Sequence, residues 1–161
     1  MNIQSFYALM AGTCFALVGL WWNVVRAKPE WAKDEQLRML ASGVYLAFLI
    51  PGLMSLIAQV SGDNKLIWRA TFALAAALGI YYAVRLMRKT SGSAPKTPFY
   101  RNRWGTVVIY AFVLLFALFP SLALFIGLLP LQMEGILLAG LVLIGHGLSW
   151  DFLMVPEPEK K

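Results

Sequence analysis

The stretch that decides the fold covers residues 104–154 and reads WGTVVIYAFVLLFALFPSLALFIGLLPLQMEGILLAGLVLIGHGLSWDFLM. As one continuous helix it would reach roughly 75 Å, far more than the ~30 Å hydrocarbon core of a bilayer. The stretch must therefore fold back on itself. Gly127 and Pro130 are turn-forming residues. We predict a tight turn between Leu128 and Leu131 that separates two membrane spans, residues 104–128 and 131–154.

Three further apolar runs precede this stretch, at residues 6–25, 40–60 and 66–87. Each is long enough to cross a bilayer as a helix. Hydrophobic residues make up 60% of the chain and charged residues 14%, whereas soluble domains have about 45–50% and 25%. The sequence therefore predicts an all-α integral membrane protein, a single transmembrane domain over residues 1–161 that forms a bundle of five helices.

The cations of the chain divide unevenly between the predicted connections. Of the 14 Lys and Arg residues, 12 lie in the first connection, the third connection and the C-terminus, and only Lys65 and Arg69 lie on the opposite side. Five spans separate these groups onto opposite faces. Because basic loops stay in the cytoplasm, we predict an outer N-terminus, a cytoplasmic C-terminus and a multi-pass protein of the inner or plasma membrane.

The third connection, residues 85–103, is polar and rich in cations. Close to anionic headgroups each Lys or Arg contributes about 1 kcal/mol of attraction. We therefore expect this loop to contact the lipid headgroups of the cytoplasmic face, through Arg85, Arg88, Lys89, Lys96, Arg101 and Arg103. Nucleic-acid binding is the alternative for such a basic segment, and we do not favour it because membrane topology already accounts for the charge.

Two kinds of residue are expected to shape the helices and their contacts. Prolines inside spans kink a helix and free a carbonyl, and such kinks are predicted at Pro51 and Pro120. Small residues spaced four apart share one face and let another helix approach closely. This pattern predicts packing positions at Ala75, Gly79, Ala83, Gly135 and Ala139.

Polar residues inside a membrane are candidates for function. His146 lies between Gly145 and Gly147, which leave room for a ligand or a water molecule. The candidates for a ligand or proton site are His146, Ser149, Asp151 and Asn23. The structural alternative is that His146 hydrogen-bonds to a neighbouring helix. Glu134 is interpreted as a carboxylate at a helix start, within reach of water, or as a partner of Arg69 or Lys65.

The sequence contains no catalytic, metal-binding or nucleotide-binding motif. One histidine and one cysteine cannot build a zinc or iron–sulfur site within a chain, so we predict no metal and no cofactor. Three functions remain open. The first is a non-enzymatic subunit or accessory protein that forms a homo-oligomer or joins a larger membrane complex. The second is a small oligomeric channel or transporter with a cavity near the kinked spans and His146. The third is an enzyme acting on a lipid or quinone.

Overall fold

Seven helices make up the part of the chain that is described, residues 2–62, 64–89 and 104–154 of a computed structural model. Four are long and apolar enough to cross a membrane: α1 (Ile3–Ala27), α3 (Glu35–Val60), α4 (Lys65–Lys89) and α8 (Pro130–Leu153). The other three are α2 (Glu30–Lys33), α6 (Trp104–Leu118) and α7 (Ser121–Phe125). These ranges contain no strand, and the predicted all-α class is confirmed.

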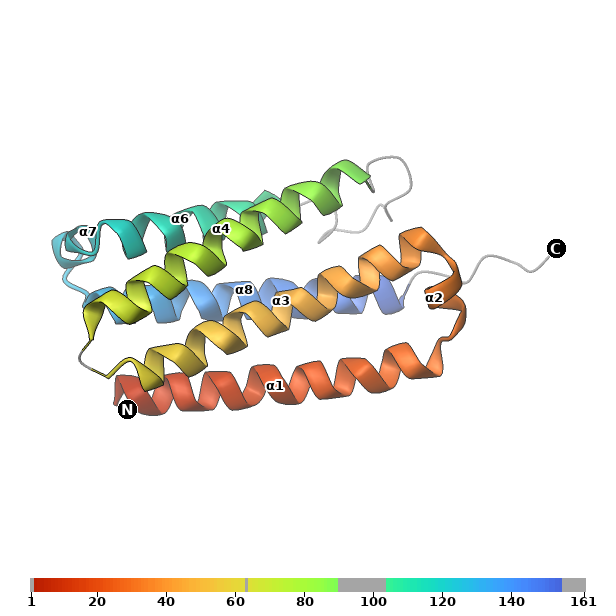
Figure 1. The fold of residues 1–161 in the computed structure, drawn as a ribbon, viewed down its shortest axis with the longest axis horizontal. Helices are drawn as coiled ribbons and strands as arrows, with labels where there is room; N and C mark the ends of the chain where they lie inside the picture. The colour runs from red at the N-terminus through yellow and green to blue at the C-terminus, as the bar shows by residue number, and fades with distance from the viewer. Residues whose placement is uncertain (1, 63, 90–103, 155–161) are drawn as a thin grey trace.

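The long helices lie side by side and alternate in direction (Figure 1). The cations of the described residues therefore lie at two ends of the bundle. One end, called the basic end, carries Arg26, Lys28, Lys33, Arg38, Arg85, Arg88 and Lys89. The opposite end, called the far end, carries Lys65 and Arg69 at the start of α4. Among the described residues, seven cations therefore lie at one end of the bundle and two at the other.

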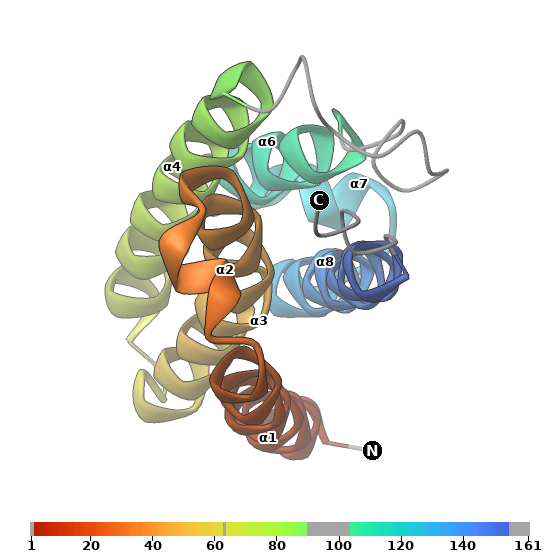
Figure 2. The ribbon, with the colours of Figure 1, turned by 90° about the vertical axis from the view of Figure 1, so that its right-hand side faces the viewer.

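Four of the helices surround the centre of the bundle. Helix α3 packs on α4 and α8, and α6 packs on the same two helices. The diagonal pairs, α3 with α6 and α4 with α8, are not packed extensively. Helix α1 lies outside this ring, mainly against α3, as the view from the basic end shows (Figure 2). Helices α3, α4, α6 and α8 therefore form a ring around the centre of the bundle.

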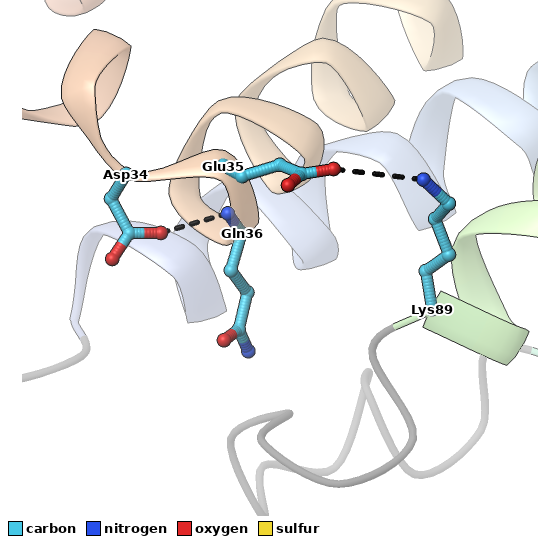
Figure 3. Close-up of polar contacts among 4 residues, drawn as sticks. All are labelled: Asp34, Glu35, Gln36 and Lys89. Atoms are coloured by element: carbon cyan, nitrogen blue, oxygen red, sulfur yellow. Dashed lines mark hydrogen bonds and ion pairs between the residues drawn. The ribbon is translucent and has the colours of Figure 1, made fainter.

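Asp34 separates α2 from α3. Its backbone is extended, and its Oδ1 accepts a hydrogen bond from the backbone N–H of Gln36 at 2.8 Å (Figure 3). The same oxygen accepts a second bond from the backbone N–H of Leu37 at 2.9 Å. This is an N-cap, which satisfies donors that the first helical turn leaves free. The neighbouring Glu35 pairs with Lys89 at 3.7 Å and links the start of α3 to the end of α4. Both side chains are exposed, so the pair contributes little stability.

The predicted kink at Pro51 leaves α3 continuous, because the helix runs through this buried residue from Glu35 to Val60. Gly52, the next residue, faces α1. A Cβ at Gly52 would lie 3.0 Å from the Cβ of Cys14. The missing side chain lets α1 approach α3 closely, so the Pro51–Gly52 pair lies at a tight contact between the two helices.

The prediction of one helix over residues 104–128 is wrong. Helix α6 ends at Leu118, and α7 begins after Pro120. Proline has no N–H to continue the helical ladder. The Arg69 side chain of α4 takes the place of the missing donors: its Nε donates to the carbonyl of Ala117 at 2.9 Å and its Nη2 to that of Leu118 at 2.8 Å. This polar bridge stabilises the end of α6.

The predicted turn before the last helix is confirmed. Gly127 has a φ of 75°, a left-handed conformation that favours glycine. Pro130 is the first residue of α8, where its missing N–H costs nothing. The Gln132 Oε1 accepts the backbone N–H of Leu129 at 2.9 Å and caps the helix start. The chain thus reverses direction within a few residues.

Helix α4 extends to Lys89, beyond the predicted end at residue 87. Arg85, Arg88 and Lys89 therefore belong to the last turns of a helix, and the prediction that they lie in a loop is wrong. Apolar residues Leu86 and Met87 continue the helix between these cations. The other predicted headgroup contacts, Lys96, Arg101 and Arg103, lie outside the described residues.

A candidate ligand cavity at the basic end

A cavity of about 530 Å³ lies within the ring of α3, α4, α6 and α8. On α3 it is lined from Glu35 to Ile50, and on α4 from Gly79 to Lys89. Arg38 and Ile50 are twelve positions apart on α3, which corresponds to about 18 Å at 1.5 Å per helical residue. Small-molecule sites typically occupy about 300–1,000 Å³. The cavity is therefore large enough for an organic ligand.

Charged residues line the cavity only at the basic end. Arg38 and Glu35 come from the start of α3, and Arg85 and Lys89 from the end of α4. Lys89 pairs with Glu35, and Arg38 Nη1 donates to the carbonyl of Ala32 at 3.3 Å. Arg38 and Arg85 are both exposed. Three cations against one carboxylate make this end of the cavity attractive to an anion.

Tyr110 of α6 closes the opposite end. Its ring lies over Gly79 of α4, where an added Cβ would stand 2.6 Å from Tyr110 Cζ. Tyr110 is 3% exposed. On its own helix, each of Tyr110, Gly79, Ile50 and Leu141 is the lining residue farthest from the basic end. Together these four residues mark the end of the cavity farthest from the basic end, which is called the floor.

Small residues from separate helices form the walls. Gly43 and Ala47 come from α3, Ala83 from α4 and Gly145 from α8. A Cβ on Gly145 would lie 3.3 Å from the Cβ of Ala47. Thr106 of α6 also lines the cavity, and its hydroxyl is buried without a hydrogen-bond partner among the described residues. The interior is thus mainly apolar, and the Thr106 hydroxyl is a polar group that a ligand could reach.

His146 was expected near a cavity, but it does not line this one. The side chain is exposed on the outer face of α8, because its neighbours Gly145 and Gly147 take the buried face. The expected bond to a neighbouring helix is also absent from the described contacts. His146 Nδ1 bonds the carbonyl of Val142 at 2.9 Å, and the ring packs edge-to-face on Phe48.

The other three predicted site residues have separate surroundings. Ser149 Oγ donates to the carbonyl of His146 at 2.8 Å, a bond within its own helix. Asn23 is exposed on α1. Asp151 is buried near the basic end, where the adjacent Phe152 packs against Trp31 with ring centroids 4.6 Å apart. Only Asp151 of the four is buried.

Glu134 is the polar residue whose surroundings differ most from those predicted from the sequence. It is fully buried, and neither carboxylate oxygen has a hydrogen-bond partner among the described residues. The expected pairing with Arg69 is wrong, since that side chain bonds α6 carbonyls. The expected position near water is also wrong. The neighbouring Tyr7 hydroxyl donates to the carbonyl of Leu131 at 2.7 Å instead.

Two of the predicted packing positions, Gly79 and Gly135, lie against aromatic side chains of other helices. Gly79 receives the ring of Tyr110, and Gly135 of α8 receives Phe6 of α1, whose Cε1 would lie 2.8 Å from an added Cβ. Ala75 packs against the buried core, and Ala139 is half-buried. Ala83 lines the cavity. Close approach of helices through small residues is therefore realised inside the bundle.

Comparisons with known proteins add no family to this description. No protein-family model, no curated protein and no solved structure matches the chain. The class supported by the structure is a small helical bundle with four helices of membrane-spanning length. Any more specific function must be argued from the cavity itself.

Proposed function

We propose that this chain is a non-enzymatic membrane protein that holds an anionic amphiphile in the cavity of the α3–α4–α6–α8 ring. The cavity carries the proposal, because its lining is mainly apolar and its charged lining residues lie at the basic end. An amphiphile has the same division, with an apolar chain and a charged head. The chain would enter the cavity, and the head would remain near Arg38 and Arg85.

We further propose that the bundle crosses the inner or plasma membrane five times. In this arrangement α6 and α7 together form the fourth span. The basic end faces the cytoplasm because cations are retained there. The cavity would then open at the level of the inner headgroups, where anionic lipids concentrate. Arg85, Arg88 and Lys89 would contact those headgroups from the end of α4.

An accessory role fits this design better than a channel does. A pore requires a polar path through the whole bundle, whereas Tyr110 and Gly79 close the cavity partway along it. Large apolar side chains are exposed on the outside, among them Phe125 at 87%. These faces suit lipid, a second copy of the chain or another membrane subunit. We therefore expect an oligomer or a larger complex.

Gentle extraction and mass analysis of bound lipids test the proposal. Ala83→Phe places a ring inside the cavity, and Ala77→Phe places the same ring on an exposed position of α4. The wild-type chain and Ala77→Phe should retain an anionic amphiphile, and Ala83→Phe should lose it. Equal retention by all three proteins would show that the bound lipid lies elsewhere.

A further inference from the structure

We propose that Tyr110 sets the length of the apolar chain that the cavity accepts, so that the protein selects amphiphiles of one chain length with an anionic head group. This inference rests on the proposed function and adds the ligand class to it. The head would be a phosphate or a carboxylate. Two groups of residues would select the ligand, and they lie at opposite ends of the cavity. Arg38 and Arg85 lie at the basic end, which is called the mouth, and Tyr110 lies at the floor.

Tyr110 and Gly79 are in close contact at the floor. The Tyr110 ring fills the space that Gly79 leaves open, at a distance that no other residue at position 79 would allow. Behind the ring lies the buried core, which includes Phe72, Met54 and Val113. A chain that reaches this floor cannot extend further without displacing core side chains. Overpacking of that kind costs about fivefold or more in binding.

The mouth provides head-group recognition. Arg38 and Arg85 belong to different helices and are both exposed at the basic end. Guanidinium groups bind phosphate and carboxylate through paired hydrogen bonds. A head group held at this end fixes where the apolar chain begins. The distance from the mouth to Tyr110 then decides how many carbons fit.

Photoreactive probes of graded chain length can test this geometry in nanodiscs. The probes are alkyl phosphates of increasing chain length with a diazirine at the chain end, and alkyl trimethylammonium probes of matching lengths serve as charge controls. We expect saturable labelling near Tyr110, Ile50 or Leu141 by alkyl phosphates, with a maximum at one chain length. The trimethylammonium probes should label these residues several-fold less. Arg38→Gln with Arg85→Gln should reduce labelling several-fold, whereas Arg26→Gln, away from the cavity lining, should not.

Substitutions at the floor test whether Tyr110 limits the chain length that the cavity accepts. Tyr110→Ala should move the maximum to longer chains, and Tyr110→Phe should leave it unchanged. If Tyr110→Ala does not fold, Ile50→Phe provides the opposite test, because a larger side chain at the floor should move the maximum to shorter chains. An unchanged maximum in a folded Tyr110→Ala or Ile50→Phe variant would overturn the inference and leave the binding proposal standing. No saturable labelling of cavity residues at any length would overturn both.

Discussion

The Arg69 guanidinium of α4 hydrogen-bonds to the last carbonyl groups of α6, with Nε 2.9 Å from the Ala117 oxygen. A second bond joins Nη2 to the Leu118 oxygen at 2.8 Å. These carbonyls have no helical partner because α6 ends before Pro120. One cation thus holds together the two helices that pack side by side on this flank of the ring.

Arg69→Met should lower the free energy of unfolding by about 1.5–3 kcal/mol, because hydrogen bonds to a charged group contribute more than neutral ones. Arg69→Lys keeps the charge and loses the planar fork, so it should show an intermediate loss. The measurement is chemical unfolding in detergent micelles followed by near-UV circular dichroism. Wild-type stability of Arg69→Met would mean that the α6 carbonyls do not need this donor.

Glu134 should be a residue whose replacement does not destabilise the fold. Its carboxylate is buried without a hydrogen-bond partner among the described residues, and burying such a group is costly. Glu134→Leu should raise the free energy of unfolding by about 1–3 kcal/mol, and the similarly shaped Glu134→Gln should not lower it. Loss of stability in both variants would reveal a partner that the carboxylate needs.

Tyr7→Phe should lower the free energy of unfolding by about 1 kcal/mol. The variant keeps the ring, which packs against Phe6 and Phe72, and removes the hydroxyl that bonds the Leu131 carbonyl. Because this bond joins α1 to the start of α8, hydrogen exchange of the first turn of α8 should also accelerate. An unchanged exchange rate there would argue that Tyr7 does not hold the helix start.

Gly79→Ala should destabilise the bundle by about 1–3 kcal/mol, because the new methyl group collides with the Tyr110 ring. Gly12→Ala is a matched control on α1, where no atom lies within 4 Å of an added Cβ. That variant should be neutral or slightly stabilising. Thermal unfolding of the two variants compares them directly. Equal effects would contradict the close contact between α4 and α6.

Labelling of engineered cysteines tests the membrane orientation. Cys14 is buried and is the only cysteine, so Cys14→Ala provides a background without thiols. Asn64→Cys at the far end should react with a membrane-impermeant maleimide on intact cells, and Lys33→Cys at the basic end should react only after lysis. The reverse pattern would contradict a cytoplasmic basic end.

Sequence reasoning found the helices because apolar length and turn residues are local signals. The hairpin at Gly127 and Pro130 was predictable for this reason. The end of α6 at Leu118 was not predicted. Pro120 interrupts the hydrogen bonds of the helix. Whether the helix then kinks or ends depends on which donors reach the carbonyl groups that the proline leaves free. Here that donor is Arg69, a tertiary partner 48 residues away.

The candidate site could not be predicted from the sequence for a similar reason. The walls and floor of the cavity combine Gly43, Ala83, Tyr110 and Gly145, which belong to four different helices. No spacing pattern within one helix indicates that they meet. His146 stood out because it is the only histidine, but the rotation of α8 places its two glycine neighbours inward and the imidazole outward.

Protection of a cysteine inside the cavity is the most direct test of the central claim. Ala83→Cys in the Cys14→Ala background places a thiol on the cavity wall, and Ala77→Cys places one on the exposed face of the same helix. The measurement is the rate of reaction with N-alkyl maleimide in nanodiscs, with and without an alkyl phosphate. The alkyl phosphate should slow the reaction at position 83 at least several-fold and leave the rate at position 77 unchanged. Equal rates with and without the alkyl phosphate at position 83 would contradict an amphiphile-binding cavity.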